Sequence, residues 1–133
     1  MYRLLDVIVI GGGQSGLASG YHLKKSGLTF LILEASGTAA GSWPEYYDSL
    51  KLFSPAKYSS LPGMSFPLPG DRYPTRDEVI HYLKDYASHY KLPIAYHSRA
   101  EQVIKVAGNF QIMTETGQTY LARNIICVTG SPT

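Results

Sequence analysis

The sequence has little of what several classes of protein require. A single cysteine, Cys127, among 133 residues excludes an intrachain disulfide and a Cys-x-x-C redox pair. No stretch approaches the roughly 20 apolar residues of a membrane-spanning helix, and Asp6 comes too early for the apolar run of a secretory signal. We therefore predict a cytoplasmic protein that has no membrane partner.

The sequence also lacks a large excess of positive or negative charge, and it has few groups that could bind a metal. The 12 Lys and Arg residues stand against 10 Asp and Glu, for a net charge of +2, whereas nucleic-acid binding needs several clustered cations. We therefore expect no nucleic-acid partner. The four histidines include no i, i+4 pair and no second cysteine could join them, so we predict no metal site. Cys127 itself lies in the apolar run 125–128 and is expected to be a buried strand residue.

What is present is the pattern of one α/β domain. With 44% hydrophobic residues, the chain can form one core. Residues 4–10 are almost continuously apolar and are followed by three glycines, which predicts a buried parallel strand. Helical spacing predicts a helix over 14–25 that stops at Gly27, and 29–33 predicts a second strand. Together these segments form a right-handed βαβ unit.

The rest of the chain predicts a loop, a helix and several short strands. Residues 36–74 hold six of the eight prolines and many aromatic residues, so we expect an ordered loop there. Thr75 and Glu78 have the spacing of a capping box, which predicts a helix over 76–90. Strands are expected at 94–96, 102–106, 110–114, 120–122 and 124–128, with a turn at Gly108-Asn109. We expect a three-strand meander set between parallel strands.

A glycine motif carries the chemistry. Gly11, Gly13 and Gly16 form G-x-G-x-x-G directly after a predicted strand and at the start of a predicted helix, which is the context that a dinucleotide-binding turn needs. Gly11 permits the tight turn, Gly13 allows a pyrophosphate to approach the backbone, and Gly16 and Gly20 let the helix pack closely on the strands. The free amides at the helix start would face the phosphates.

Glu34 indicates which dinucleotide binds. It lies at the end of the second predicted strand, where a carboxylate accepts hydrogen bonds from ribose hydroxyls and repels a 2′-phosphate. The site should therefore take FAD or NAD rather than NADP. A simple NAD domain would continue with another helix and parallel strand, whereas here Glu34 is followed by the aromatic loop and later by a meander. This order favours FAD.

Six ordered segments resemble signatures of flavin-containing monooxygenases, most closely those of the small bacterial, YUCCA-like branch. The segments are 11–18 (GGGQSGLA), 40–43 (AGSW), 50–55 (LKLFSP), 61–64 (LPGM), 73–76 (YPTR) and 128–130 (VTG). The resemblance implies that residues 1–133 form one Rossmann-like FAD-binding α/β domain of the GR2 type, a parallel sheet with a β-meander, and that this domain is incomplete. It also implies an enzyme that uses FAD, takes NAD(P)H as reductant, and uses dioxygen to oxygenate a small nucleophilic or carbonyl substrate.

The resemblance further implies cofactor-binding residues, although no catalytic side chain is assigned because the cofactor performs the hard step. The pyrophosphate would be held by Gly11, Gly13, Gln14, Ser15 and Gly16. The ribose would be bound by Glu34, with Ala35 beside it. Residues alongside the pyrophosphate and flavin would be Gly41, Ser42, Trp43, Leu52, Phe53 and Ser54. Val103 would meet the adenine through its backbone, and the turn near the cofactor would contain Thr129 and Gly130.

The family continues with a second G-x-G-x-x-G domain for the nicotinamide, and this sequence has no second copy of the motif. We therefore expect the N-terminal portion of a two-dinucleotide flavoprotein, which by itself binds FAD weakly or not at all and does not oxidise NAD(P)H. Its partner would be a missing C-terminal portion or a second copy in a homodimer. The alternative is a non-catalytic FAD-binding or accessory module. A thioredoxin-reductase-like function is disfavoured by the single cysteine.

Overall fold

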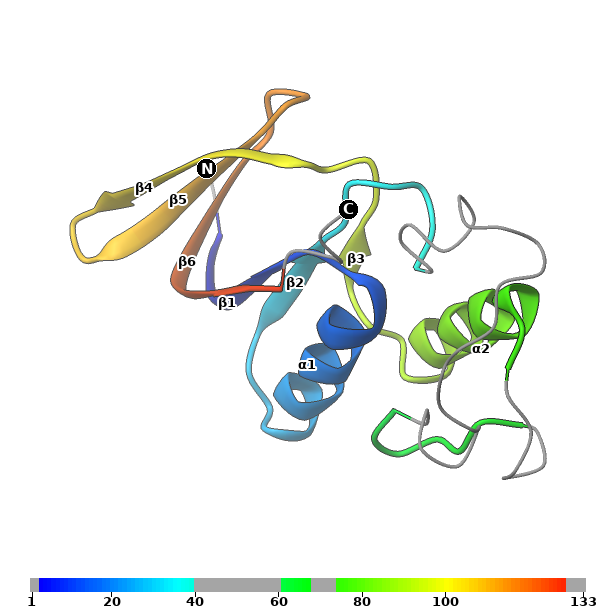
Figure 1. Cartoon of the computed structure of the whole chain (residues 1–133). Coiled ribbons are helices and arrows are strands. Elements are labelled where there is room, and N and C mark those ends of the chain that lie inside the picture. The colour runs from blue at the N-terminus through cyan, green and yellow to red at the C-terminus, as the bar shows by residue number, and fades with distance from the viewer. Residues whose placement is uncertain (1–2, 40–60, 68–73, 129–133) are drawn as a thin grey trace.

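The structure, a computed structural model, describes residues 3–39, 61–67 and 74–128. These residues form a six-stranded sheet of order β3-β2-β1-β6-β5-β4 with two helices (Figure 1). The elements in chain order are β1 (Leu4–Ile10), α1 (Gly13–Lys25), β2 (Phe30–Leu33), α2 (Arg76–His89), β3 (Ile94–Ala95), β4 (Ala100–Val106), β5 (Asn109–Thr114) and β6 (Thr119–Cys127). Neither helix of the described residues is long and apolar enough to cross a membrane.

The βαβ unit expected from the sequence is confirmed. β1 pairs in parallel with β2 on one side and with β6 on the other, and β2 pairs in parallel with β3. The parallel register sets Ile10 opposite Leu33, so the carboxyl ends of β1 and β2 lie side by side. Residues that follow those two ends are therefore brought together, as is usual at the ligand-binding edge of a parallel sheet.

The meander is present, but its arrangement differs from the expected one. Residues 120–122 and 124–128 were predicted as separate strands, whereas β6 is one continuous strand of nine residues. It pairs antiparallel with β5 through its first half and parallel with β1 along most of its length. The third meander strand is therefore itself a parallel strand. No glycine or proline interrupts β6, and Arg123 stays in the strand with its exposed side chain 3.8 Å from Asp6.

The hairpin between β4 and β5 also turns one residue earlier than predicted. The two residues between the strands are Ala107 and Gly108, and Asn109 already pairs with Val106. Both turn residues have positive φ, 51° and 84°, which is the conformation of a two-residue hairpin turn whose twist matches the strands. The sequence signal pointed to Gly108-Asn109 because asparagine is common in such turns.

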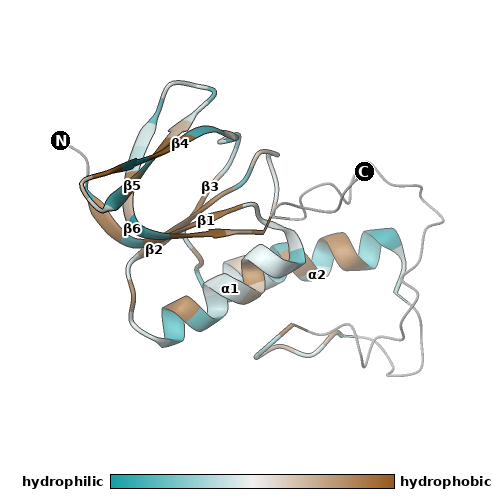
Figure 2. Cartoon of the chain, turned by 60° about the vertical axis from the view of Figure 1, so that its left-hand side comes forward, coloured by the Kyte–Doolittle hydropathy of each residue, from teal (hydrophilic) through white to brown (hydrophobic). Residues whose placement is uncertain are grey.

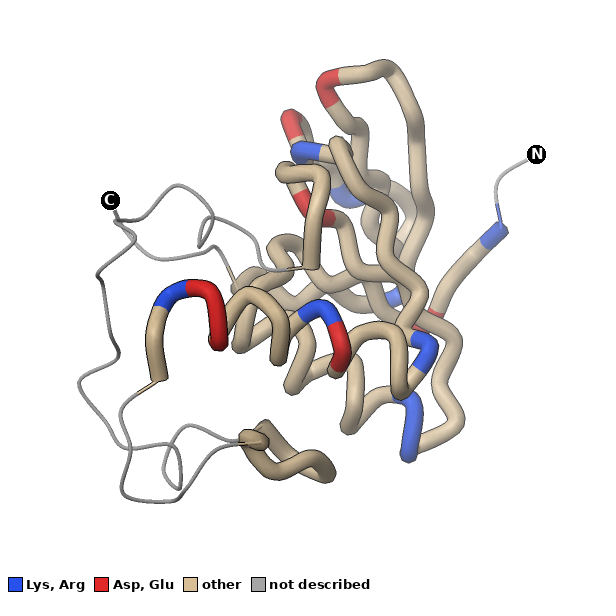
Figure 3. The backbone as a smooth tube through the Cα atoms, turned by 90° about the vertical axis from the view of Figure 1, so that its right-hand side faces the viewer, with Lys and Arg blue, Asp and Glu red and all other residues tan. Residues whose placement is uncertain are grey.

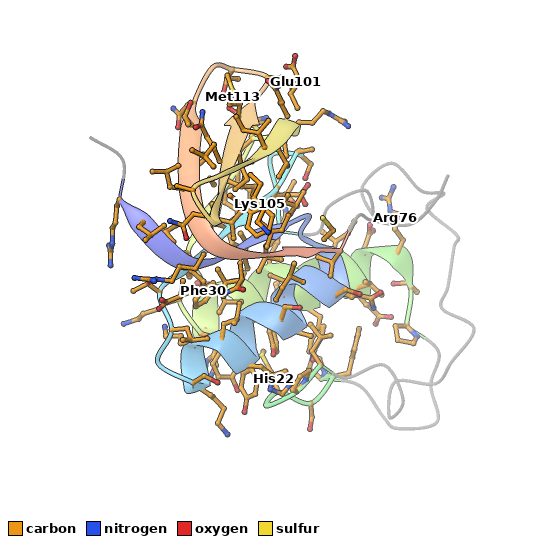
Figure 4. The ribbon with its side chains drawn as sticks, turned by 90° about the vertical axis from the view of Figure 1, so that its left-hand side faces the viewer. His22, Phe30, Arg76, Glu101, Lys105 and Met113 are labelled. Atoms are coloured by element: carbon orange, nitrogen blue, oxygen red, sulfur yellow. The ribbon has the colours of Figure 1, made fainter. Side chains whose placement is uncertain are left out.

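The described residues form three layers. Figure 2 shows α1 and α2 on one side of the parallel strands and the β4–β5 hairpin on the other. The helix-side core cluster includes Val9, Leu17 and Leu83, and the meander-side cluster includes Ile8 and Ile112. Neighbouring residues of β1 thus point into different cores, as strand alternation requires. Figure 4 shows the same layering through its labels, with Met113 and Glu101 in the meander, Phe30 in the sheet and His22 on α1.

The prediction that Cys127 is buried is wrong, because its side chain is exposed. Strand alternation places Cys127 on the same face as Ile125, which packs in the meander-side cluster. The β5–β6 ladder, however, begins at the pair Phe110–Ala122. The meander therefore does not reach over the last residues of β6.

Two tyrosines of α2 and the tyrosine that caps its C-terminus hold the turn 61–64. Tyr82, Tyr86 and Tyr90 are spaced by four residues and therefore lie along one face of the helix. Their hydroxyls donate hydrogen bonds to three carbonyls of the segment Pro62–Met64. The Leu61 amide in turn donates to the Tyr82 hydroxyl at 2.7 Å. Of the aromatic loop expected over 36–74, only 36–39, 61–67 and 74 lie within the described residues, and 61–64 is the part fixed by α2.

We expect Tyr86→Phe to lower the free energy of unfolding by about 1–2 kcal/mol, the typical cost of removing one partner of a buried hydrogen bond. The Tyr86 side chain is fully buried, and its hydroxyl donates to the Pro62 carbonyl at 2.6 Å. Burial raises the pKa of this phenol, so it remains a donor throughout the neutral pH range. Urea unfolding measures the effect.

Tyr120→Phe, which removes an exposed hydrogen bond to the Gln118 side chain, is the control and should change the free energy of unfolding by less than about 0.5 kcal/mol. Equal effects of the two variants would contradict the role of Tyr86.

Candidate functional site

The start of α1 presents backbone amides for which the described residues provide no acceptor. Gly12 is the N-cap, and no side chain caps the helix. The first helical hydrogen bond runs from the Gly16 amide to the Gly12 carbonyl at 3.2 Å. The amides of Gly13, Gln14 and Ser15 therefore have no helical acceptor, and no other acceptor for them is present among the described residues. The first turn carries no acidic side chain, so the positive end of the helix dipole is not neutralised locally.

Two glycines of the motif are required by different local constraints. Gly13 has φ +67°, and a Cβ built on it would meet nothing within 4 Å. Its backbone is thus in a glycine-favoured conformation beside open space. Gly16 is the opposite case, because a Cβ there would lie 2.3 Å from the carbonyl oxygen of Gly11. Close packing of α1 on the β1 turn therefore depends on the missing side chain of Gly16.

Glu34 faces the same turn from the end of β2. Its side chain is 7% exposed. One carboxylate oxygen, Oε1, accepts a hydrogen bond from the Gly12 amide at 2.8 Å, and Oε2 accepts one from the Ser36 amide at 2.7 Å. Each carboxylate oxygen has two lone pairs, so the two backbone bonds fix the orientation of the group and leave acceptor capacity for a ligand.

Backbone hydrogen bonds hold the strand ends together around Glu34. The Gly11 amide donates to the Leu33 carbonyl at 2.8 Å, which ties the glycine turn to β2. On the other side, the Glu34 amide donates to Ala95 and the Glu34 carbonyl accepts from Ser98, each at 2.9 Å. Glu34 therefore lies between the β1 turn and the segment that follows β3.

The structure brings together most of the predicted residues that it describes. The residues gathered around the β1 turn and the end of β2 are Gly11, Gly13, Gln14, Ser15, Gly16, Glu34 and Ala35. Val103 lies apart from them on β4, the last strand of the sheet, where it pairs with Ile112 and is 39% exposed. The predicted residues outside the described part of the chain are Gly41, Ser42, Trp43, Leu52, Phe53, Ser54, Thr129 and Gly130. All these cofactor assignments stay predictions.

Sequence reasoning missed the groups that orient Glu34. The Gly12 and Ser36 amides bind its two oxygens, yet neither residue was singled out. Gly12 stands at a variable position of the motif, so the motif itself assigns no function to this residue. A signal was available all the same, since a carboxylate at the end of β2 must lie near the turn after β1 once the strands are parallel. Among the described residues, no group of three His, Cys, Asp or Glu gathers that could hold a metal ion.

Comparison with known proteins decides the family. A model of the pyridine nucleotide-disulphide oxidoreductase family matches residues 8–132. The chain belongs to this family. A CzcO-like oxidoreductase of Geobacillus kaustophilus is 39% identical over 130 residues, which are 98% of this chain and 37% of that protein. The probable indole-3-pyruvate monooxygenase YUCCA1 of Arabidopsis thaliana is 33% identical over 92% of this chain and 30% of its own length.

Solved structures give the same result for the fold. The flavin-containing monooxygenase from Stenotrophomonas maltophilia superposes with a TM-score of 0.91 at 40% identity, and the match covers all of this chain and 42% of that one. The resemblance to flavin monooxygenases and the Rossmann-like α/β fold inferred from the sequence are thereby confirmed. This member of the family spans between 30% and 42% of the length of these relatives.

Proposed function

We propose that this chain is the FAD-binding part of an NAD(P)H-dependent flavin monooxygenase that oxygenates a small nucleophilic or carbonyl substrate with dioxygen. The observation that carries the proposal is the position of the Glu34 carboxylate. It lies 2.8 Å from the amide of Gly12 and next to a helix start whose first amides have no acceptor among residues 3–39, 61–67 and 74–128. A ribose and a pyrophosphate of one dinucleotide need these two kinds of group side by side.

The residues present fit the ADP half of FAD. The amides of Gly13, Gln14 and Ser15 would donate to the pyrophosphate, helped by the positive end of α1. The open space beside Gly13 leaves room for phosphate oxygens to approach the backbone. Glu34 would accept hydrogen bonds from ribose hydroxyls and would repel a 2′-phosphate. A bound flavin supplies the redox chemistry, and this chain's task is to bind and orient its ADP half.

The relatives support the oxygenase assignment. Two of the similar proteins are named for monooxygenation, the Arabidopsis YUCCA1 protein and the Stenotrophomonas flavin-containing monooxygenase. The family name also refers to disulphide reduction, and the single cysteine Cys127 cannot form the redox pair of that reaction within this chain. Oxygenation, a small-molecule substrate and NAD(P)H as reductant therefore belong to the proposal.

Calorimetric titration tests the binding part. We expect ADP and FAD to compete for one site. We expect ADP carrying an additional 2′-phosphate to bind at least about tenfold more weakly, a difference of about 1.4 kcal/mol, because Glu34 opposes the second negative charge. No binding of ADP, or equal binding of the two nucleotides, would contradict the proposed site.

The activity part is tested by oxygen uptake. A protein that carries this chain together with a nicotinamide-binding portion is supplied with FAD, NADPH or NADH, and a thioether or ketone, and oxygenated product is measured alongside oxygen consumption. The proposal expects product formation that requires FAD. Flavin binding without NAD(P)H oxidation by the whole protein would instead support the alternative of a non-catalytic flavin-binding module.

A further inference from the structure

A second concave site lies on α2, away from the glycine turn. It is a pocket of about 520 Å³ between the C-terminal half of α2 and the segment 37–39, a volume within the range of small-molecule sites. Three of its lining residues are buried and apolar, namely Ala39, Ala87 and Leu92. These small and aliphatic side chains form an apolar surface inside the pocket. None of the lining residues is among those proposed to bind FAD.

The exposed lining of this pocket is cationic. Lys84 and Lys91 line it, while none of its lining residues within the described part of the chain is acidic. Figure 3 shows basic and acidic positions next to each other along α2. The carboxylate of the acidic neighbour Asp85 lies 3.1 Å from Nε2 of His81, one turn earlier on α2. Tyr96 adds an aromatic ring that is 40% exposed, and burial and the charge of Glu34 raise the pKa of its phenol, so the hydroxyl remains a donor.

The backbone conformation of Lys91 is a feature of this residue separate from the lining of the pocket. The Lys91 amide donates to Ser88 at 3.2 Å and the Leu92 amide donates to Ala87 at 3.1 Å, which is the Schellman ending of a helix. Lys91 occupies the left-handed position of this motif with φ +51°. Glycine is the usual residue there. A lysine at this position therefore carries a backbone cost that glycine would avoid.

The lysines of the pocket are not needed to neutralise the end of the helix. Cations near a helix C-terminus often serve the last carbonyl groups. In this molecule that task falls to Lys24 of α1, whose Nζ donates to the carbonyl of Tyr90 and lies 3.4 Å from that of Lys91. The side chains of Lys84 and Lys91 are therefore available to a ligand.

We propose that this pocket binds a small organic anion, with its carboxylate or phosphate group between Lys84 and Lys91 and its apolar body against Ala87, Leu92 and the ring of Tyr96. Ammonium groups bind either anionic group as point charges. The apolar lining contributes through burial of the ligand body. The inference does not depend on FAD binding, because the two sites share no residue.

The test uses benzoate and phenyl phosphate as probes, with benzyl alcohol as the uncharged analogue, and follows amide shifts by NMR during titration of the whole chain. We expect saturable millimolar binding of the two anions, and binding of the alcohol at least about tenfold weaker. Lys91→Gly should raise Tm, because glycine suits the left-handed position, and should weaken anion binding at least about tenfold. A better-folded variant that loses the ligand cannot be explained by misfolding.

Two further variants make the test decisive. Lys84→Met keeps most of the length of the side chain without its charge and should also weaken anion binding, whereas Lys105→Met on β4 should leave anion binding unchanged. The proposal is overturned if the anions do not bind, if Lys91→Gly binds them as the unsubstituted chain does, or if benzyl alcohol binds equally well. Displacement of benzoate by ADP would also overturn it, since that would place the anion in the nucleotide site.

Discussion

Replacing Gly16 by alanine is expected to destabilise the chain by about 3 kcal/mol and to abolish binding of ADP and FAD. The new Cβ would lie 2.3 Å from the carbonyl oxygen of Gly11 and 3.1 Å from its carbonyl carbon. Both atoms belong to the backbone of the turn after β1, so no side chain can move aside. The N-terminus of α1 would have to move away from the strands, and with it the amides that face the pyrophosphate. Urea unfolding and ADP titration measure the two losses.

Gly27→Ala is the matched control. Gly27 follows α1 at its other end with φ +74°, and a Cβ there meets nothing within 4 Å. The substitution should therefore cost only the backbone strain of a left-handed alanine, about 1 kcal/mol, and should leave ADP affinity unchanged. If Gly16→Ala proved as mild as this control and kept its nucleotide affinity, close packing of α1 on the turn would not be what the glycine provides.

The elements that could be predicted from the sequence are those with strong local signals. The apolar run before three glycines predicted a strand over residues 4–10, and β1 has the same bounds, Leu4–Ile10. The capping box is present at the start of α2, with the Thr75 side chain accepting from the Glu78 amide and Glu78 accepting from the Thr75 amide. Each of these features is encoded within a few residues, so no knowledge of the tertiary fold was needed.

Features that depend on distant parts of the chain could not be predicted in the same way. Whether Cys127 is covered depends on where β5 stops pairing with β6, and the apolar neighbours of Cys127 carry no information about that. The continuity of β6 depends on β1, which pairs with it from Leu121 to Cys127 and supports the strand through Arg123. The strands predicted at 120–122 and 124–128 left that arginine outside both.

In the candidate site, too, local features could be predicted and features set by distant segments could not. The spacing of Gly11, Gly16 and Glu34 was sufficient to place them at one edge of a parallel sheet. The orientation of the Glu34 carboxylate was not predictable, because it is set by amides of two separate segments, at Gly12 and Ser36. The pocket on α2 was missed for a similar reason, since its lining comes from the segments 37–39 and 84–92 and from Tyr96.

Glu34→Gln should weaken ADP binding at least about tenfold and lower the free energy of unfolding by about 1–3 kcal/mol. The variant keeps the shape of the side chain but replaces one acceptor oxygen by an NH₂ group, which can only donate. Because the Gly12 and Ser36 amides each donate to a different oxygen of Glu34, one of them would face another donor. The remaining carbonyl would also lose the negative charge that attracts ribose hydroxyls. Calorimetry and urea unfolding measure the two changes.

The decisive quantity is the ratio of affinities for ADP and for ADP carrying a 2′-phosphate. A variant that is merely less stable would lose both affinities in proportion, so the ratio would not change. Loss of the negative charge of Glu34 removes the repulsion that disfavours the second phosphate, and the ratio should fall toward one. Glu101→Gln, an exposed change on β4, serves as control and should leave the ratio and the stability unchanged. A ratio in Glu34→Gln equal to that of the unsubstituted chain would show that Glu34 does not contact the ribose, and the proposed FAD site would lose its central residue.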